Sequence, residues 1–274
     1  MSADREERRE DDSVRAARQV HALLQPLRIR QRQWAAGLAD ELPEEEAEAV
    51  WAQPLVVRLE KASPPPRAAV LRAAARASLA VLADPRTGEG GPWEPACRRW
   101  LAGRVRKVAR RARGAAWEAV QRLDGVGVED GGAQVRAFPP GPTAELPREL
   151  ARLQVGGTDV PGELPIDRPA NGPTLWVSPE EMTAGKLMAQ VGHASMLLAA
   201  YLPEVELAPW IAAGLPVSVC RADRPRWSAL NAGPTDPEER WTSLATVVVR
   251  DAGFTEIAPG TVTVVAERGE AGRR

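Results

Sequence analysis

Short runs of β-branched and aliphatic residues alternate with longer amphipathic stretches from about residue 53 onward, a pattern that predicts alternating strands and helices. The first series comprises a strand at 55–57, an alanine-rich helix at 66–82, an apolar stretch at 105–108, a helix around Trp117 and a strand at 126–128. Turn-forming residues at 130–132 and 139–141 close this series.

The same order of elements returns in the second half of the chain. It comprises a strand at 175–177, a helix at 185–201, an apolar stretch at 217–219, a helical stretch around Trp227, a strand at 247–249 and a final strand at 261–265. Strands begin at 55 and 175, 120 positions apart, and at 126 and 247, 121 positions apart. The repetition predicts two tandem small α/β domains, each a mixed sheet of about four strands flanked by helices.

The segments outside the two series are different in character. Residues 1–50 form a charged helical arm, in which Pro26 is expected to kink or end the first helix and Glu44 to Glu46 form a solvated acidic run. This arm could pack on a domain or hold a partner. Glycine and proline pairs between 146 and 172 predict a linker, which leaves domains at 51–145 and 173–268.

Composition narrows the class of protein. Among 274 residues, 36 are Lys or Arg and 37 are Asp or Glu, which excludes a uniformly basic nucleic-acid protein but permits a local basic patch. A charged start and the lack of a long apolar run argue against secretion and membrane insertion, so a cytoplasmic location is expected. With two cysteines and two histidines, the sequence predicts reduced thiols and no multi-histidine metal centre.

The first concentration of chemically useful side chains is Thr-Ala-Gly-Lys-Leu-Met-Ala-Gln-Val-Gly-His-Ala at 183–194, which follows a strand and opens a helix. Helical spacing places Lys186, Gln190 and His193 on one stripe. A cation at a helix amino terminus would reinforce an anion site, and an imidazole can exchange a proton near neutral pH. The alternative is an amphipathic helix with a solvated polar face.

The second concentration lies at 250–263. Three valines lead to Asp251 at the end of a strand, Gly253 permits a sharp turn, and Thr255 offers a hydroxyl. Pro259 and Gly260 then reverse the chain into the closing strand. Ligands of α/β sheets gather at such strand ends. A turn in which the aspartate caps the backbone is the alternative.

Together the two segments resemble the type-2 peptidyl-tRNA hydrolase family, whose pattern is Gly-Lys-x-x-Ala-Gln-x-x-His-Ala followed by Arg-Asp-Ala-Gly-x-Thr-x-Ile-x-Pro-Gly-Thr. The resemblance covers about 173–268 and implies hydrolysis of the ester between a peptide, or an N-blocked amino acid, and the 3′ end of tRNA, in translation quality control and ribosome rescue. It implies no metal and no cofactor. The implied catalytic residues are Lys186, Gln190, His193, Asp251 and Thr255, and the implied substrate-binding residues are Gly185, Arg250, Gly253, Pro259, Gly260 and Thr261.

Three positions depart from the family pattern. Gly192 stands where Ser or Ala is common before the histidine, and Phe254 and Glu256 stand where Arg and Gln are common. Substrate handling is therefore expected to differ. These changes leave open a non-catalytic tRNA- or RNA-binding module that keeps the fold, and the charged arm leaves open a protein-interaction scaffold.

The first domain resembles a degenerate copy of the second, because it has no Lys, Gln and His stripe while Asp130 stands where Asp251 stands in the second. It would position tRNA or replace the second subunit of a dimer, giving a pseudo-dimeric monomer, although a homo-oligomer stays open. Its basic run is interleaved with Trp93, Trp100 and Trp117, which favours RNA contact or, alternatively, a solvated basic face. The basic residues expected to contact tRNA are Arg98, Arg99, Arg104, Arg106, Lys107, Arg110 and Arg111.

Overall fold

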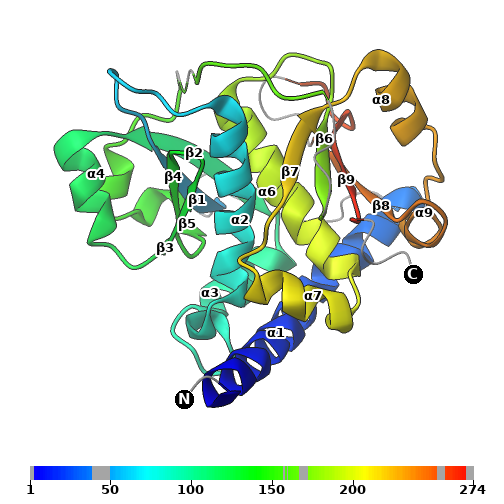
Figure 1. Cartoon of the computed structure of the whole chain (residues 1–274), viewed down its shortest axis with the longest axis horizontal. Coiled ribbons are helices and arrows are strands. Elements are labelled where there is room, and N and C mark those ends of the chain that lie inside the picture. Colours follow the sequence, from blue (N-terminus) through cyan, green and yellow to red (C-terminus); the bar gives the residue numbers. More distant parts are fainter. Residues whose placement is uncertain are drawn as a thin grey trace.

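Two mixed β-sheets, one from each half of the chain, organise the structure (Figure 1). This computed structural model describes residues 3–38, 50–156, 158, 160–166, 172–251 and 257–269, with side chains described from residue 11 onward. All statements below concern those residues.

The first sheet has the strand order β2-β1-β4-β3. Strand β1 (Trp51–Arg58) runs parallel to β2 (Arg106–Ala112) and antiparallel to β4 (Ala133–Ala137), and β4 is also antiparallel to β3 (Val126–Asp130). A short strand, β5 (Gly141–Pro142), pairs with the start of β1. The helices of this half are α2 (Arg67–Ala83), α3 (Glu94–Ala102) and α4 (Gly114–Gln121), with a 3-10 turn, η2, at Pro85–Thr87. We call residues 51–142 the first unit.

The second sheet has the order β7-β6-β9-β8. Strand β6 (Thr174–Val177) runs parallel to β7 (Ser218–Arg221) and antiparallel to β9 (Val262–Glu267), and β9 is antiparallel to β8 (Thr246–Arg250). Its helices are α6 (Ala184–Tyr201), α7 (Glu204–Ala212), α8 (Arg224–Asn231) and α9 (Pro237–Leu244). We call residues 174–267 the second unit.

The two sheets share strand order, strand direction and register. Val57 pairs with Val135, which pairs with Val128. In the second unit, Val177 pairs with Val264, which pairs with Val249. Asp130 and Asp251 each follow the last valine of their strand by two positions, so they lie at the same end of equivalent strands. A register shift between Val249 and Arg250 is present in the second unit and not in the first. The predicted pair of tandem α/β domains is confirmed.

The units pack on each other through α2 and α6, which lie between the sheets (Figure 1). Both helices are rich in alanine at their buried positions, so their backbones approach closely. The Ser195 hydroxyl of α6 donates to the backbone carbonyl of Ala75 in α2 at 2.8 Å. One apolar core therefore runs through both units.

The amino-terminal arm is a single helix, α1 (Ala3–Ala35), which continues through Pro26. The expectation that Pro26 ends this helix is wrong, because tertiary contacts hold both sides of it. Val20 and Leu24 are fully buried, and Arg28 donates to both carboxylate oxygens of Glu238 in α9. The arm thus packs on both units, with contacts to α2 and α3 as well as to α6 and α7. The acidic run at 44–46 lies outside the described residues.

Some elements were not predicted. In β4 only every second residue is buried, and two of the three buried residues are alanines, so its apolar signal is weak. The predicted linker contains helix α5 (Arg148–Ala151), preceded by a 3-10 turn, η3, at Thr143–Glu145. Leu150 and Leu153 are buried against Trp117 and Phe138, so this part of the segment packs on the first unit.

Neither cysteine forms a disulfide in the described part of the chain, and both Cys97 and Cys220 are buried. Burial raises the pKa of the Cys97 thiol to about 12, which leaves it protonated and unreactive at neutral pH. None of the described helices combines the length and the apolar character needed to cross a bilayer.

Candidate active site

Helix α6 starts directly after the loop that follows β6, and this start positions the predicted site residues. The Thr183 hydroxyl caps the helix by accepting a hydrogen bond from the backbone N–H of Lys186 at 3.2 Å. Lys186 and Gln190 then lie one turn apart on the face that looks toward the end of β8.

Lys186 and Gln190 meet on one oxygen of Asp251. The Lys186 ammonium forms an ion pair with Oδ2 of Asp251, and the Gln190 amide donates to the same oxygen at 2.9 Å. Two hydrogen bonds fix the backbone of Asp251: its N–H donates to the carbonyl of Thr261 at 2.9 Å, and its carbonyl accepts from the N–H of Gly260 at 2.7 Å. Asp251 and Gln190 are each 5% exposed, so the carboxylate is fixed in a nearly dry environment.

Thr263 of β9 completes this cluster. Its hydroxyl donates to Oε1 of Gln190 at 2.6 Å. An ionised carboxylate only accepts hydrogen bonds, so Gln190 must turn its NH₂ toward Asp251 and its oxygen toward Thr263. The chain from Thr263 through Gln190 to Asp251 therefore has one direction, and it fixes the orientation of the amide.

His193 lies on the same helix stripe but faces a different partner. Its Nδ1 is 3.3 Å from Nζ of Lys107, which comes from β2 of the first unit. No hydrogen bond joins His193 to Asp251 among the described residues; the carboxylate is contacted by Lys186 and Gln190 instead. Burial, and then the charges of Lys107 and Lys186, lower the pKa of His193 well below its ordinary value.

The second unit matches the model of a known protein family. Residues 175–269 match the family model of peptidyl-tRNA hydrolase PTH2. The resemblance expected from the two motifs is thereby confirmed for this segment, which starts in β6, ends just after β9, and contains the whole Lys186, Gln190, Asp251 and Thr263 cluster. No solved structure matches the chain.

The remaining predicted residues of the PTH2 segment surround this cluster. Arg250 stacks over the Trp34 ring of α1 at 4.3 Å from the ring centroid and donates to the carbonyl of Gly260 at 3.5 Å. Gly260 has φ +80°, a left-handed conformation that favours glycine in the turn from Pro259 to Thr261. Gly185 lies in the first turn of α6. Gly253 and Thr255 lie outside the described residues, as do Phe254 and Glu256.

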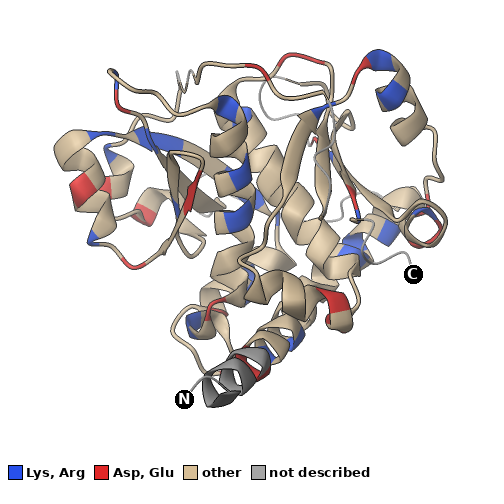
Figure 2. Ribbon diagram, in the orientation of Figure 1, with Lys and Arg blue, Asp and Glu red and all other residues tan. Residues whose placement is uncertain are grey.

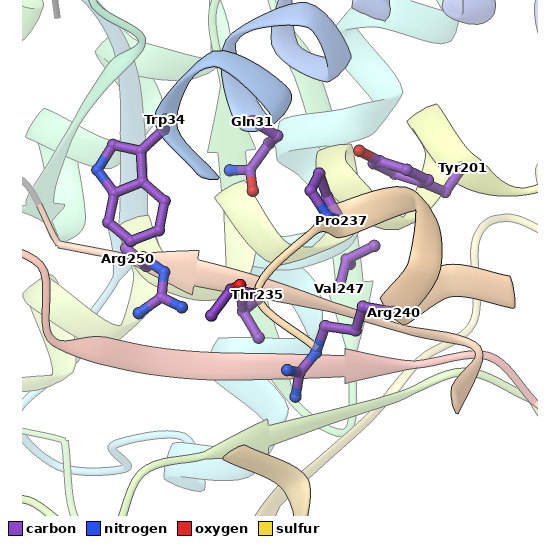
Figure 3. A pocket seen from close by; sticks show the side chains of 9 residues that line it. Gln31, Trp34, Tyr201, Thr235, Pro237, Arg240, Val247 and Arg250 are labelled. Atoms are coloured by element: carbon purple, nitrogen blue, oxygen red, sulfur yellow. The ribbon is translucent and has the colours of Figure 1, made fainter. Parts of the chain in front are cut away.

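A small pocket lies beside the PTH2 cluster, between α1, α9 and the edge strand β8 (Figure 3). Figure 3 shows Trp34 beside Arg250, with Gln31 and Pro237 nearby. The residues that line this pocket are Gln31, Trp34, Tyr201, Thr235, Pro237, Arg240, Val247, Val248 and Arg250. The arm therefore contacts a residue adjacent to Asp251, a contact that the sequence did not predict.

The basic run of the first unit does not form the surface expected of it. Lys107 and Arg110 are buried, so the prediction that they contact tRNA is wrong. The reason is that both faces of β2 are covered: Lys107 faces α6, where its Nζ contacts Met196, and Arg110, three positions further on, lies on the opposite face and donates to the Leu153 carbonyl at 2.9 Å. The tryptophans expected to stack on bases are buried too, at Trp93, Trp100 and Trp117. Figure 2 shows basic residues on α2 and α8 as well as on β2.

Two residues that contact predicted site residues were missed from the sequence: Thr263, which contacts Gln190, and Lys107, which contacts His193. Thr263 is a lone hydroxyl in a valine-rich strand, which is a usable signal for a polar role on a buried face. Lys107 is the single lysine in a run of arginines, but the run does not reveal which of its cations turns toward α6.

Proposed function

We propose that the protein hydrolyses the ester bond between a peptide, or an N-blocked amino acid, and the 3′ end of tRNA. The observation that carries the proposal is the convergence of Lys186, Gln190 and Thr263 on the buried carboxylate of Asp251, inside the segment that matches the PTH2 family. Peptidyl-tRNA is the substrate class that the family match supports.

In the proposed reaction, Asp251 orients or deprotonates the attacking water. The Gln190 amide holds the carboxylate in place, and Thr263 holds the amide. Lys186 stabilises the negative charge that develops on the ester oxygen, or holds the terminal phosphate of the tRNA. Thr255 is retained as a candidate that orients water or carbonyl, on the strength of its motif position alone.

The first unit is proposed to be a degenerate copy without turnover. Its equivalent carboxylate, Asp130, is held by two guanidinium groups: Arg72 donates to Oδ1 at 2.8 and 2.5 Å, and Arg76 donates to Oδ2 at 3.1 Å. Because guanidinium groups stay charged at all physiological pH values, this carboxylate stays paired. The α2–α6 contact then supports a monomer that mimics a dimer. Domain limits of 51–145 and 173–268, with a linker at 146–172, complete the proposal.

Contact with tRNA through the first unit is retained for Arg98, Arg99, Arg104, Arg106 and Arg111. Charge reversal at Arg106 tests this role and should raise the KM for tRNA. An unchanged KM would remove the RNA-binding role of this surface. Since peptidyl-tRNA is a product of translation, the proposed activity also places the protein in the cytoplasm.

The activity itself is tested with purified full-length protein and N-acetyl-aminoacyl-tRNA, by measuring the release of free tRNA. The wild-type protein should release tRNA catalytically, and Lys186→Ala should lower turnover by about 100-fold. Asp124→Ala is the matched surface control, because the Asp124 side chain is 89% exposed and should be dispensable. Binding of tRNA without any release by the wild-type protein would instead support a non-catalytic RNA-binding module.

A further inference from the structure

The side chain of Lys107, in the first unit, contacts α6, the helix that carries most of the candidate active site. It lies on β2, is 9% exposed, and its Nζ is 2.9 Å from Sδ of Met196 in α6. The same atom lies 4.8 Å from the centroid of the Trp100 ring and 3.3 Å from Nδ1 of His193. Among the described residues, no carboxylate forms an ion pair with Lys107.

Gly192 explains how this lysine fits. A Cβ atom at position 192 would lie 2.4 Å from the Ser78 hydroxyl of α2, and 2.9 and 3.0 Å from Cε and Cδ of Lys107. The two shorter distances are below those of real Cβ contacts and the third is unusually tight, so a side chain at 192 would require both neighbours to move. The glycine stands where the family pattern often has Ser or Ala, and the space that it leaves is occupied by the first unit.

We propose that Lys107 is a positioning residue of the active site, contributed by the first unit, that donates to Nδ1 of His193 and holds the imidazole as the Nε2–H tautomer. The inference deepens the proposed hydrolase function and rests on it for the catalytic consequence. It also gives the first unit a role that does not require a catalytic residue of its own.

The electrostatics of the contact agree with this geometry. Burial lowers the pKa of Lys107 well below its ordinary value, and burial with the charges of Lys107 and Lys186 does the same to His193. The charged groups that act on His193 are Lys107 from β2 and Lys186 from its own helix. His193 is therefore neutral near pH 7, which allows Nδ1 to accept from Lys107 and leaves the proton on Nε2, and Lys186 is the cation that pairs with Asp251.

Histidine NMR tests the proposal directly, because the chain contains only two histidines, His21 and His193. Long-range ¹⁵N–¹H correlation of the imidazoles reports the tautomer and the titration of each. In the wild-type protein, His193 should show the Nε2–H tautomer and should stay neutral below pH 6.5. His21 is the internal reference, since its Nε2 contacts the carbonyl of Leu202 at 2.8 Å, far from Lys107 in sequence.

Lys107→Met keeps the length and apolar stem of the side chain and removes its nitrogen. In this variant His193 should lose its tautomer preference and its pKa should move toward about 6.5, while kcat falls about 10-fold and KM for tRNA stays unchanged. Lys61→Met, at an exposed lysine of the same unit, should match the wild-type protein in every measurement.

Each result has a defined meaning. An Nδ1–H tautomer in the wild-type protein overturns the proposal, whether or not Lys107→Met folds. Tautomer and titration of His193 unchanged in a folded Lys107→Met variant also overturn it. The NMR readout needs no substrate, so the expected spectra together with an absence of hydrolysis would reject the proposed function and leave the lysine–histidine contact in place.

Discussion

The two units each place a carboxylate two positions after the last valine of the equivalent strand and surround it with different cations. Asp130 is clamped by Arg72 and Arg76, with 17% of its side chain exposed, whereas Asp251 meets an ammonium and an amide and is 4% exposed. Two permanently charged, planar guanidiniums fill the acceptor sites of Asp130 and make it structural. An ammonium and a neutral amide on one oxygen hold Asp251 while supplying a single compact cation that can respond to a substrate. The strand order is thus common to both units, whereas the side chains that contact the carboxylate differ.

The largest expected effect separates the two carboxylates. Asp251→Asn should lower turnover of N-acetyl-aminoacyl-tRNA by about 100-fold or more, because it removes the carboxylate proposed to orient or deprotonate water. Asp130→Asn should change turnover less than twofold, although it removes the negative charge and one of the two acceptor oxygens that Arg72 and Arg76 share. A comparable loss in both variants would show that the carboxylates act alike and would break the comparison.

Gly192→Ala tests the fit between the units. The added methyl group must displace Ser78 and Lys107 from the α6 backbone, so the free energy of unfolding should fall by about 1–3 kcal/mol, the usual cost of overpacking. Chemical denaturation measures this change. Gly156→Ala is the control, because a Cβ there would meet no atom within 4 Å; equal stability loss in both variants would contradict close packing at 192.

Thr263→Val tests the hydrogen-bond chain. Valine keeps the shape of threonine but cannot donate to Gln190, so the amide loses its fixed orientation and kcat should fall about 10-fold. Thr263→Ser, which restores the hydroxyl, should recover most of the loss. Equal rates in the valine and serine variants would assign Thr263 to packing alone.

The smallest expected effect is a gain in stability, and it is expected for Lys107→Met. Burial lowers the pKa of Lys107, so the unfolded chain keeps a proton on this amine at pH values where the folded protein has lost it. The free energy of unfolding therefore decreases as pH falls below the ordinary pKa of lysine. Lys107→Met should remove that cost and raise the free energy of unfolding at pH 7 by about 1 kcal/mol or more. A lower free energy of unfolding for the variant at pH 7 would indicate that the contacts of the Lys107 amine outweigh the cost of burying it.

Much of the architecture follows from local sequence, and the contacts between units do not. Short apolar runs predict β6 and β8, and the spacing of Lys186 and Gln190 places them on one face because helices repeat every 3.6 residues. Lys107 points inward because it lies on the face of β2 that packs against α6. The sequence of the basic run does not show which face that is. The passage of α1 through Pro26 likewise depends on distant partners such as Glu238, which override the local preference of proline.

Single-turnover hydrolysis of N-acetyl-aminoacyl-tRNA, with enzyme in saturating excess, tests the central claim most directly because it removes differences in substrate binding. Wild-type protein should convert the bound substrate to free tRNA and N-acetyl-amino acid, and Asp251→Asn should bind the same substrate but cleave it about 100-fold more slowly. Equal cleavage rates for the two proteins would contradict a reaction centred on Asp251.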